Sequence, residues 1–394
     1  MATAAIEQNT EFRDDRGIYI ISGISHELSG LVIFSILPIF VAALITEMGL
    51  TTSQGGYVAS ADIIGISISS LGAFFWINRV SWRKISYFLL CSLITMNIIC
   101  CFLTDFEQIF IARLICGLIE GALFSLAIAM LSRTTHPDRN FAFTFGTSLL
   151  TGAINIYLMS YLIQVFGVKG VFFDLILFCC LPLIFWHKAV PDKAMEETSD
   201  ATKPSQKSTV APYIIWLILL ANLIYFIGQG GLWSYVKQIA AQAELTDEMI
   251  KSGLSISLLA GMLGAGFASW LDVKVGRVIP LAVALLLAIF SVYLLSQDIT
   301  AMSFAVAACF YNFGSNIGHP YLFGYLSSID PGRKYVVASG AMQTGGMGLG
   351  PAIAAYFIIG DDLGPVLTVA YMAFIGALIL FVPIMLLIKG SRSR

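Results

Sequence analysis

Residues 17–46 read GIYIISGISHELSGLVIFSILPIFVAALIT, and Glu27 is the one charged side chain in this stretch. A helix needs about 20 mostly apolar residues, at 1.5 Å of rise each, to cross the hydrocarbon core of a bilayer. Residues 17–46 therefore predict a membrane-spanning helix, and similar apolar stretches follow along the chain.

The composition agrees with a membrane protein. Hydrophobic residues make up 58% of the 394 residues and charged residues only 12%, whereas soluble domains carry about 25% charged residues. The formal net charge of -2 gives no indication of a nucleic-acid partner. We therefore expect an all-α membrane protein whose solvent is the lipid bilayer.

Windows of about 20 apolar residues predict twelve spans, six on each side of a polar segment at 188–210. The predicted spans are 17–46, 51–78, 84–104, 108–132, 140–165, 169–187, 211–238, 249–272, 279–296, 299–328, 335–360 and 364–388. The expected organisation is a tail at 1–16, a six-helix bundle at 17–187, a linker at 188–210, a second bundle at 211–389 and a tail at 390–394.

The basic residues predict the orientation. With both termini in the cytoplasm, eighteen of the 22 Lys and Arg residues fall in inward segments and three in outward segments, while Arg113 lies within a span. Cytoplasmic loops carry the excess of Lys and Arg. This bias predicts a multi-pass protein of the cytoplasmic (inner) membrane with its linker inside the cell.

The two halves of the chain repeat. Positions 194 residues apart often carry matching residues at equivalent places in the predicted topology. The matching pairs are Gly72 and Gly266, Asn78 and Asp272, Arg83 and Arg277, Pro137 and Pro331, Arg139 and Arg333, Gly146 and Gly340, and Gly152 and Gly346. Parallel repeats of six spans predict two bundles around an axis normal to the membrane.

Two repeated segments resemble a family signature. Residues 72–84 read GAFFWINRVSWRK and residues 272–277 read DVKVGR, which is similar to the loop between spans 2 and 3 of the major facilitator superfamily. The resemblance covers essentially the whole chain and implies two pseudo-symmetric six-helix bundles, alternating access and a monomer. It also implies a gating loop that locks the bundles on the inner side, carried by Gly72, Asn78, Arg79, Arg83, Asp272, Lys274 and Arg277. Asn78 stands where the family has Asp, and Ser81 where it has Gly.

Span 4 contains a second motif. Residues 113–117 read RLICG, which is similar to the Arg-x-x-x-Gly motif that the superfamily links to proton coupling. The Gly-Pro pair of its antiporters is absent from span 5, where the sequence has Gly146 and Gly152, and a Gly-Pro pair occurs in span 11 at Gly350 and Pro351.

Ionisable groups at membrane depth are costly and mark functional sites by default. We expect proton coupling at Glu27, Asp62, Arg113, Glu120 and His26. Arg113 and Glu120 are seven residues apart, so they share a helix face that can point to a central cavity. One Arg cannot neutralise three carboxylates, which leaves a carboxylic acid able to take up and release a proton. The alternative is a static salt bridge that joins spans 1, 2 and 4.

A polar stripe in span 10 predicts the solute site. Asn312, Asn316 and His319 are spaced i, i+4, i+7 and would be costly against lipid. We expect them to bind solute together with Gln229, Trp233, Tyr235, Gln343, Asn155 and Tyr157. The alternative is hydrogen bonding between helices.

Cofactor and metal sites are not expected. The seven cysteines form no CxxC pair and no Cys/His cluster, and no glycine-rich run has the form of a phosphate-binding loop. The proton gradient is therefore the expected driving force, in place of ATP.

The sequence thus predicts a secondary transporter of a small organic molecule and not an enzyme. Three carboxylates against one Arg favour a neutral, zwitterionic or cationic solute. We expect export by proton antiport, with proton symport as the first alternative. Two alternatives belong to other functional classes: a membrane sensor with the same fold, and a membrane-embedded enzyme.

Overall fold

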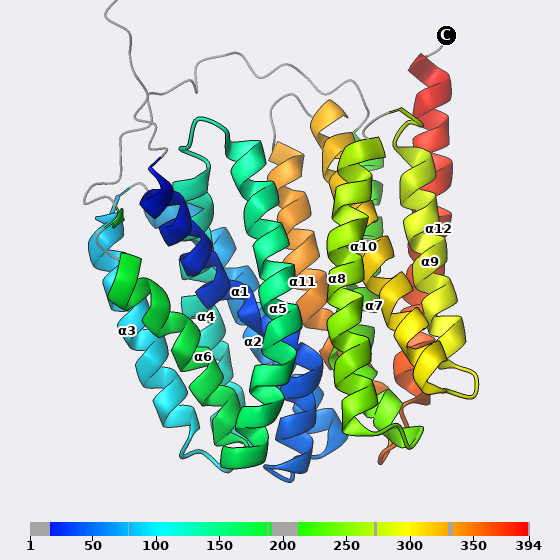
Figure 1. Ribbon diagram of the computed structural model, residues 1–394. Helices are drawn as coiled ribbons and strands as arrows, with labels where there is room; N and C mark the ends of the chain where they lie inside the picture. The colour runs from blue at the N-terminus through cyan, green and yellow to red at the C-terminus, as the bar shows by residue number, and fades with distance from the viewer. Residues whose placement is uncertain are drawn as a thin grey trace, which may run out of the picture.

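The structure is a computed structural model that describes residues 16–77, 79–186, 189–190, 212–271, 274–329 and 334–392. Within these segments the chain forms twelve α-helices and no strand. The all-α fold with twelve helices is therefore confirmed. The helices lie side by side, and most of them extend from one end of the molecule to the other (Figure 1).

The helices follow the predicted spans closely. In the first half they are α1 (Gly17–Thr46), α2 (Thr52–Trp76), α3 (Trp82–Cys100), α4 (Phe106–Leu131), α5 (Pro137–Phe166) and α6 (Lys169–Leu181). In the second half they are α7 (Pro212–Gln242), α8 (Asp247–Leu271), α9 (Val278–Leu295), α10 (Ala301–Ile329), α11 (Lys334–Phe357) and α12 (Gly364–Arg392). Apolar run length sets these limits, because a backbone surrounded by lipid must satisfy its hydrogen bonds within a helix.

The span expected at 169–187 differs from a single regular helix. α6 ends at Leu181, and a π-helix follows at Pro182–Trp186. Pro182 has no N–H for the preceding turn, so the regular ladder is interrupted at that point.

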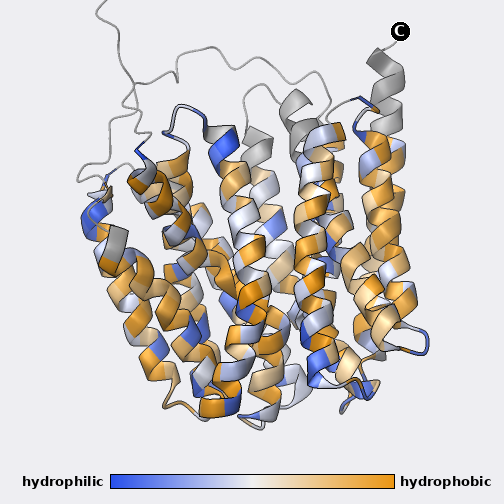
Figure 2. Cartoon of the chain, viewed as in Figure 1, coloured by the Kyte–Doolittle hydropathy of each residue, from blue (hydrophilic) through white to orange (hydrophobic). Residues whose placement is uncertain are grey.

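Nine helices in the described part of the chain are long and apolar enough to cross a membrane. The other three are the short α6, and α10 and α11, which carry polar residues of the cavity described below. Hydrophobic residues, coloured orange, predominate along most of the length of the helices (Figure 2). Large apolar residues such as Phe75, Leu263 and Tyr356 are exposed there, as expected of a surface that faces lipid.

The packing repeats between the halves. In the first half α2 packs on α4, α1 on α5, and α3 on α4 and α6; in the second, α8 packs on α10, α7 on α11, and α9 on α10 and α12. The halves meet through α2 with α11, α5 with α8, and α1 with α7. The contacts therefore show the same twofold pattern as the sequence repeat.

Glycines allow the closest approach, between α2 and α4. A Cβ on Gly117 would overlap the backbone carbonyl of Asp62, and one on Gly121 would overlap that of Ile66. Small residues let helix backbones touch in this way. The contact places Asp62 beside α4, next to Arg113.

The bundle has two ends, a proximal side and a distal side. The proximal side is the end at which α1 begins and α12 ends, and the distal side carries the turns at 47–51, 101–105 and 243–246. Several of the hydrogen bonds between the halves lie toward the distal side: Tyr235 Oη donates to the Thr52 carbonyl at 3.2 Å, and Ser255 Oγ donates to the Ala153 carbonyl at 2.8 Å. The halves are thus closed distally.

Candidate functional site

A cavity of about 770 Å³ lies between the two halves. Its walls come from α1, α2, α4 and α5 on one side and from α7, α8, α10 and α11 on the other. It reaches Ile77, Ala129 and Gly340, which lie toward the proximal ends of their helices, and among its lining residues Phe34, Trp233 and Tyr311 lie in the distal halves of α1, α7 and α10. The cavity is therefore a proximal chamber with a distal floor.

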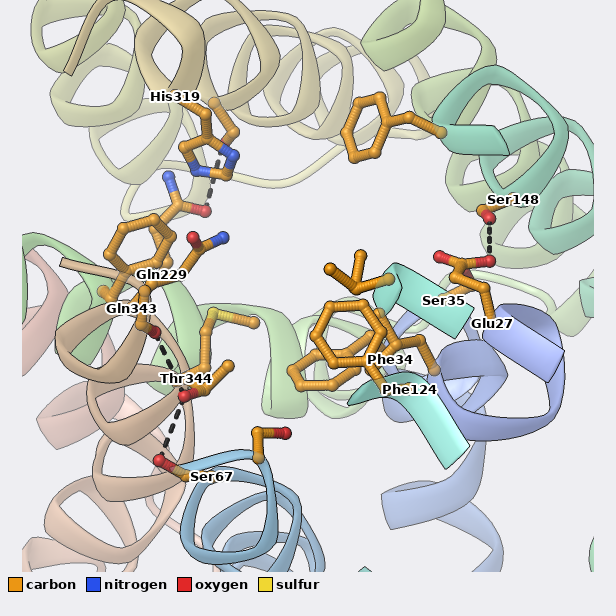
Figure 3. A pocket seen from close by; sticks show the side chains of 18 of the residues that line it. Glu27, Phe34, Ser35, Ser67, Phe124, Ser148, Gln229, His319, Gln343 and Thr344 are labelled. Carbon is orange, nitrogen blue, oxygen red and sulfur yellow. Dashed lines mark hydrogen bonds between the residues drawn. The ribbon is translucent and has the colours of Figure 1, made fainter. Parts of the chain in front are cut away.

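Glu27 is the carboxylate in the wall of the first half. It is 7% exposed, and its Oε2 accepts a hydrogen bond from Ser148 Oγ of α5 at 2.6 Å. Figure 3 shows Glu27 and Ser148 together on one side of the cavity. No Lys or Arg of the described residues lines the cavity with it, so no cation in the wall neutralises this carboxylate.

The wall of the second half is polar without being charged. Gln229, Gln343 and His319 lie opposite Glu27 (Figure 3). Gln229 donates to Tyr225 Oη at 2.8 Å and accepts from Ser315 Oγ at 2.9 Å. These bonds hold the Gln229 amide in one orientation in the wall.

The polar stripe of α10 faces the cavity, as expected. Asn312, Asn316 and His319 all line it. Asn312 Nδ2 donates to Ser257 Oγ of α8 at 2.9 Å, so this amide also joins two helices. His319 Nε2 is buried without a hydrogen-bond partner, and its ring packs on Phe226 with centroids 4.8 Å apart. The stripe thus combines cavity lining with helix contacts.

Three of the other predicted coupling residues, Asp62, Arg113 and Glu120, form a closed network with Asn97 behind the wall. Arg113 donates to Asp62 from Nε at 3.1 Å and from Nη2, to Glu120 Oε1 at 3.1 Å and to Asn97 Oδ1 at 3.0 Å. All four side chains are buried, and none of them lines the cavity. The expectation that Arg113 and Glu120 face the cavity is therefore wrong for this conformation, because the α2–α4 contact encloses them.

His26 also points away from the cavity. Its Nε2 lies 2.6 Å from Ser86 Oγ of α3, and its Nδ1 lies 2.7 Å from the Ser22 carbonyl. Neighbouring residues of a helix point in directions about 100° apart, which is why His26 and Glu27 face different surroundings.

Three residues expected to bind solute lie elsewhere. Asn155 Nδ2 donates to Asp174 Oδ2 at 2.9 Å, between α5 and α6. Tyr157 Oη lies 3.0 Å from Ser252 Oγ at the contact of α5 with α8, and Tyr235 bonds to Thr52 on the distal side. None of the three lines the cavity, because the neighbouring helices set which way each side chain faces.

A family model described as the Major Facilitator Superfamily matches residues 23–355. The chain belongs to this superfamily. It is accordingly an integral, multi-pass membrane transporter. No curated protein matches the sequence significantly.

Solved superfamily structures have the same fold. The chain is similar to the crystal structure of a mutant of the nucleoside transporter NupG, with a TM-score of 0.70, 12% identity, and coverage of 93% of this chain and 99% of that chain. It is also similar to a structure from work on substrate recognition in proton-dependent oligopeptide transporters, with a TM-score of 0.75, 10% identity, and coverage of 95% and 99%. At these identities the similarity shows the fold alone.

The loops that resemble the superfamily's gating signature lie on the proximal side. Arg79 is exposed there, and Arg83 Nε donates to the Val190 carbonyl at 2.8 Å. Lys274 Nζ donates to the Trp270 carbonyl at 2.9 Å, and Arg277 precedes α9. A Cβ added to Gly72 would meet no atom within 4 Å. Asn78 and Asp272 lie outside the described residues.

Several cavity residues of this superfamily member were not predicted from the sequence. They are apolar or hydroxyl side chains: Phe34, Ser67, Phe124, Ser148, Phe226, Tyr311, Ser315, Thr344 and Met347. Such residues are common in any membrane helix, so no sequence signal distinguishes the lining ones.

In the described segments no group of three or more His, Cys, Asp or Glu residues could hold a metal ion.

Proposed function

We propose that this transporter exports a small organic solute from the cytoplasm in exchange for protons. The cavity in this conformation is closed distally and extends to the proximal side. The bias of Lys and Arg toward the proximal segments supports a cytoplasmic location for that side. Solute would therefore enter the cavity from the cytoplasm.

A single observation supports proton antiport. Glu27 is a carboxylate in the cavity wall, bonded to Ser148, with no Lys or Arg among the described lining residues. Burial disfavours an unpaired charge on such a group. Glu27 therefore holds either a proton or a cationic or hydrogen-bond-donating part of a solute, and competition between the two couples their movement in opposite directions.

The walls restrict the solute to a chemical class. One carboxylate and four amides, from Gln229, Asn312, Asn316 and Gln343, offer donors and acceptors but no fixed positive charge. Phe34, Phe124, Trp233 and Tyr311 supply apolar surface. These residues favour a neutral, zwitterionic or cationic solute with an apolar part over an organic anion.

The Arg113 network would provide a second proton site. Asp62 and Glu120 share one guanidinium, and their outer atoms Oδ1 and Oε2 are buried without a partner. One added proton neutralises the excess charge of this triad. The proton would reach the triad in a conformation other than this one, and His26 would have no part in the exchange.

Proton symport is the second candidate. The sequence of α5 favours symport, because the only proline in this helix is Pro137, at its first position. The Gly-Pro pair associated with antiporters is thus absent. Symport would use the same carboxylate, but solute and proton would bind together.

The test is the lumenal pH of proteoliposomes when a candidate solute is added outside without an imposed gradient. Alkalinisation means that solute enters as protons leave, which supports antiport, whereas acidification overturns it in favour of symport. Glu27→Gln should abolish either signal. Glu47→Gln is the matched control, because Glu47 caps the same helix on its exposed distal end.

Two other outcomes contradict the proposal. Solute entry without any pH change would show that protons are not coupled. Solute binding without entry, in protein that retains its fold, would support the sensor alternative.

A further inference from the structure

At the floor of the cavity, α1 and α7 are joined by one side chain. Trp233 Nε1 of α7 donates to the Phe34 carbonyl of α1 at 2.7 Å. Trp233 is 5% exposed, and both residues line the cavity. The hydrogen bond therefore connects the two halves at the boundary between the chamber and the distal seal.

The Phe34 carbonyl is available because of a proline. In a regular helix it would accept from the N–H four residues later, at position 38. That residue is Pro38, which lies inside α1 and has no N–H. The indole of Trp233 thus occupies the position of the missing intrahelical donor, and a buried carbonyl that would otherwise lack a partner is satisfied.

The ring of Trp233 belongs to the cavity wall. It stacks on Tyr311 of α10 with ring centroids 5.5 Å apart and planes 4° from parallel. Tyr311 Oη in turn donates to the Gln229 carbonyl, one turn before Trp233 in α7, at 2.8 Å. A solute on the cavity floor would therefore contact the same ring whose N–H holds the two halves together.

We propose that Trp233 is a positioning residue that links the solute-facing floor to opening of the distal side. When the distal side is closed, the Trp233 N–H donates to the Phe34 carbonyl. When the distal side is open, each of the two groups forms a hydrogen bond with water instead. Separation without water leaves both unpaired, which is costly in a dry interior. This hydrogen bond therefore lets the distal side open only as water enters, and its role is independent of the proton chemistry proposed for Glu27.

The test is hydrogen–deuterium exchange of the purified transporter without solute, read at residues 234–242 of α7 and 247–257 of α8. Trp233→Phe keeps an aromatic ring but removes the donor, so exchange there should rise roughly 2- to 10-fold, the effect of losing one hydrogen bond. In a Pro38→Ala background the same substitution should have a smaller effect, because the alanine introduced at position 38 has an N–H that can donate to the carbonyl.

Control variants distinguish the effect of losing this hydrogen bond from a general effect of replacing a tryptophan or a helix proline. Trp270→Phe and Pro383→Ala change an exposed tryptophan and an exposed helix proline and should leave exchange at these segments unchanged. If Trp233→Phe does not fold, benzothienylalanine at position 233 removes the N–H while keeping the two-ring shape. An unchanged exchange rate without the donor, or an equal effect in the Pro38 protein and in the Pro38→Ala background, would overturn the proposal.

Discussion

Arg113 is held by several partners at once. Its guanidinium bonds to Asp62, Glu120 and Asn97, and it lies over the Phe40 ring at 5.4 Å from the centroid. Arginine suits such a site because its planar guanidinium group offers five N–H donors and remains positively charged. The residue therefore compensates two carboxylates that the fold has enclosed, whether or not they also exchange protons.

Removing Arg113 should destabilise the protein strongly. Arg113→Met leaves Asp62 and Glu120 buried without a cation, and breaking a buried pair in this way costs about 3–5 kcal/mol. The measurement is the thermal unfolding midpoint in detergent. Glu120→Gln keeps an acceptor for Arg113 and removes the excess negative charge, so it should be tolerated. An Arg113→Met protein as stable as the unmodified one would show that the network contributes little.

At the scale of elements, α2 and α4 depend on small residues. Gly65 of α2 and Gly117 and Gly121 of α4 each meet backbone of the opposite helix. The same contact brings Asp62 beside Arg113, so the helix packing and the buried network require each other. Gly346 and Gly350 of α11 lie in the same way against α7.

An added methyl group at this contact should separate the two helices. Gly117→Ala places a Cβ on the Asp62 carbonyl, and overpacking of this kind costs roughly 1–3 kcal/mol. We expect a lower unfolding midpoint. Gly72→Ala is the matched control within α2, because nothing lies within 4 Å of an added Cβ there, and its midpoint should not fall. Equal midpoints for the two variants would contradict the close-contact interpretation.

At the scale of the whole molecule, the two halves form a chamber that is closed at one end. Distal contacts join α1 to α7, α2 to α11, and α5 to α8. Alternating access requires these contacts to separate, since they close the distal side of the chamber. Transport should therefore stop if they are fixed covalently.

A cross-link between Tyr157 and Ser252 tests this requirement. Their hydroxyl groups are 3.0 Å apart, one in each half, so cysteines at both positions can be joined by a short reducible thiol reagent after Cys91, Cys180 and Cys309 are replaced by Ser. Cross-linking should abolish solute flux, and reduction should restore it. Cysteines at Glu248 and Lys251, within α8, are the control. Continued flux in the cross-linked protein would mean that the halves do not separate at α5 and α8.

The sequence alone determined the elements of this fold. Most helices are set by a local property, the length of an apolar run, so the predicted spans matched the helices within a few residues, except that α6 ends at Leu181 and a π-helix follows it. Six of the nine residues expected to bind solute line the cavity, and five of these six are amides or a histidine. A polar group within a span must avoid lipid, and this requirement can be read from one segment.

The tertiary structure decided which way each polar residue faces inside the bundle. Asn155, Tyr157 and Tyr235 carry polar groups as Gln229 does, yet they contact α6, α8 and α2 instead of the cavity. Glu27 meets Ser148 across 121 positions of sequence, and Trp233 meets Phe34 across 199. Avoiding lipid is a requirement on one helix, whereas the choice between cavity and neighbour depends on helices far away in the chain, so only their packing could settle it.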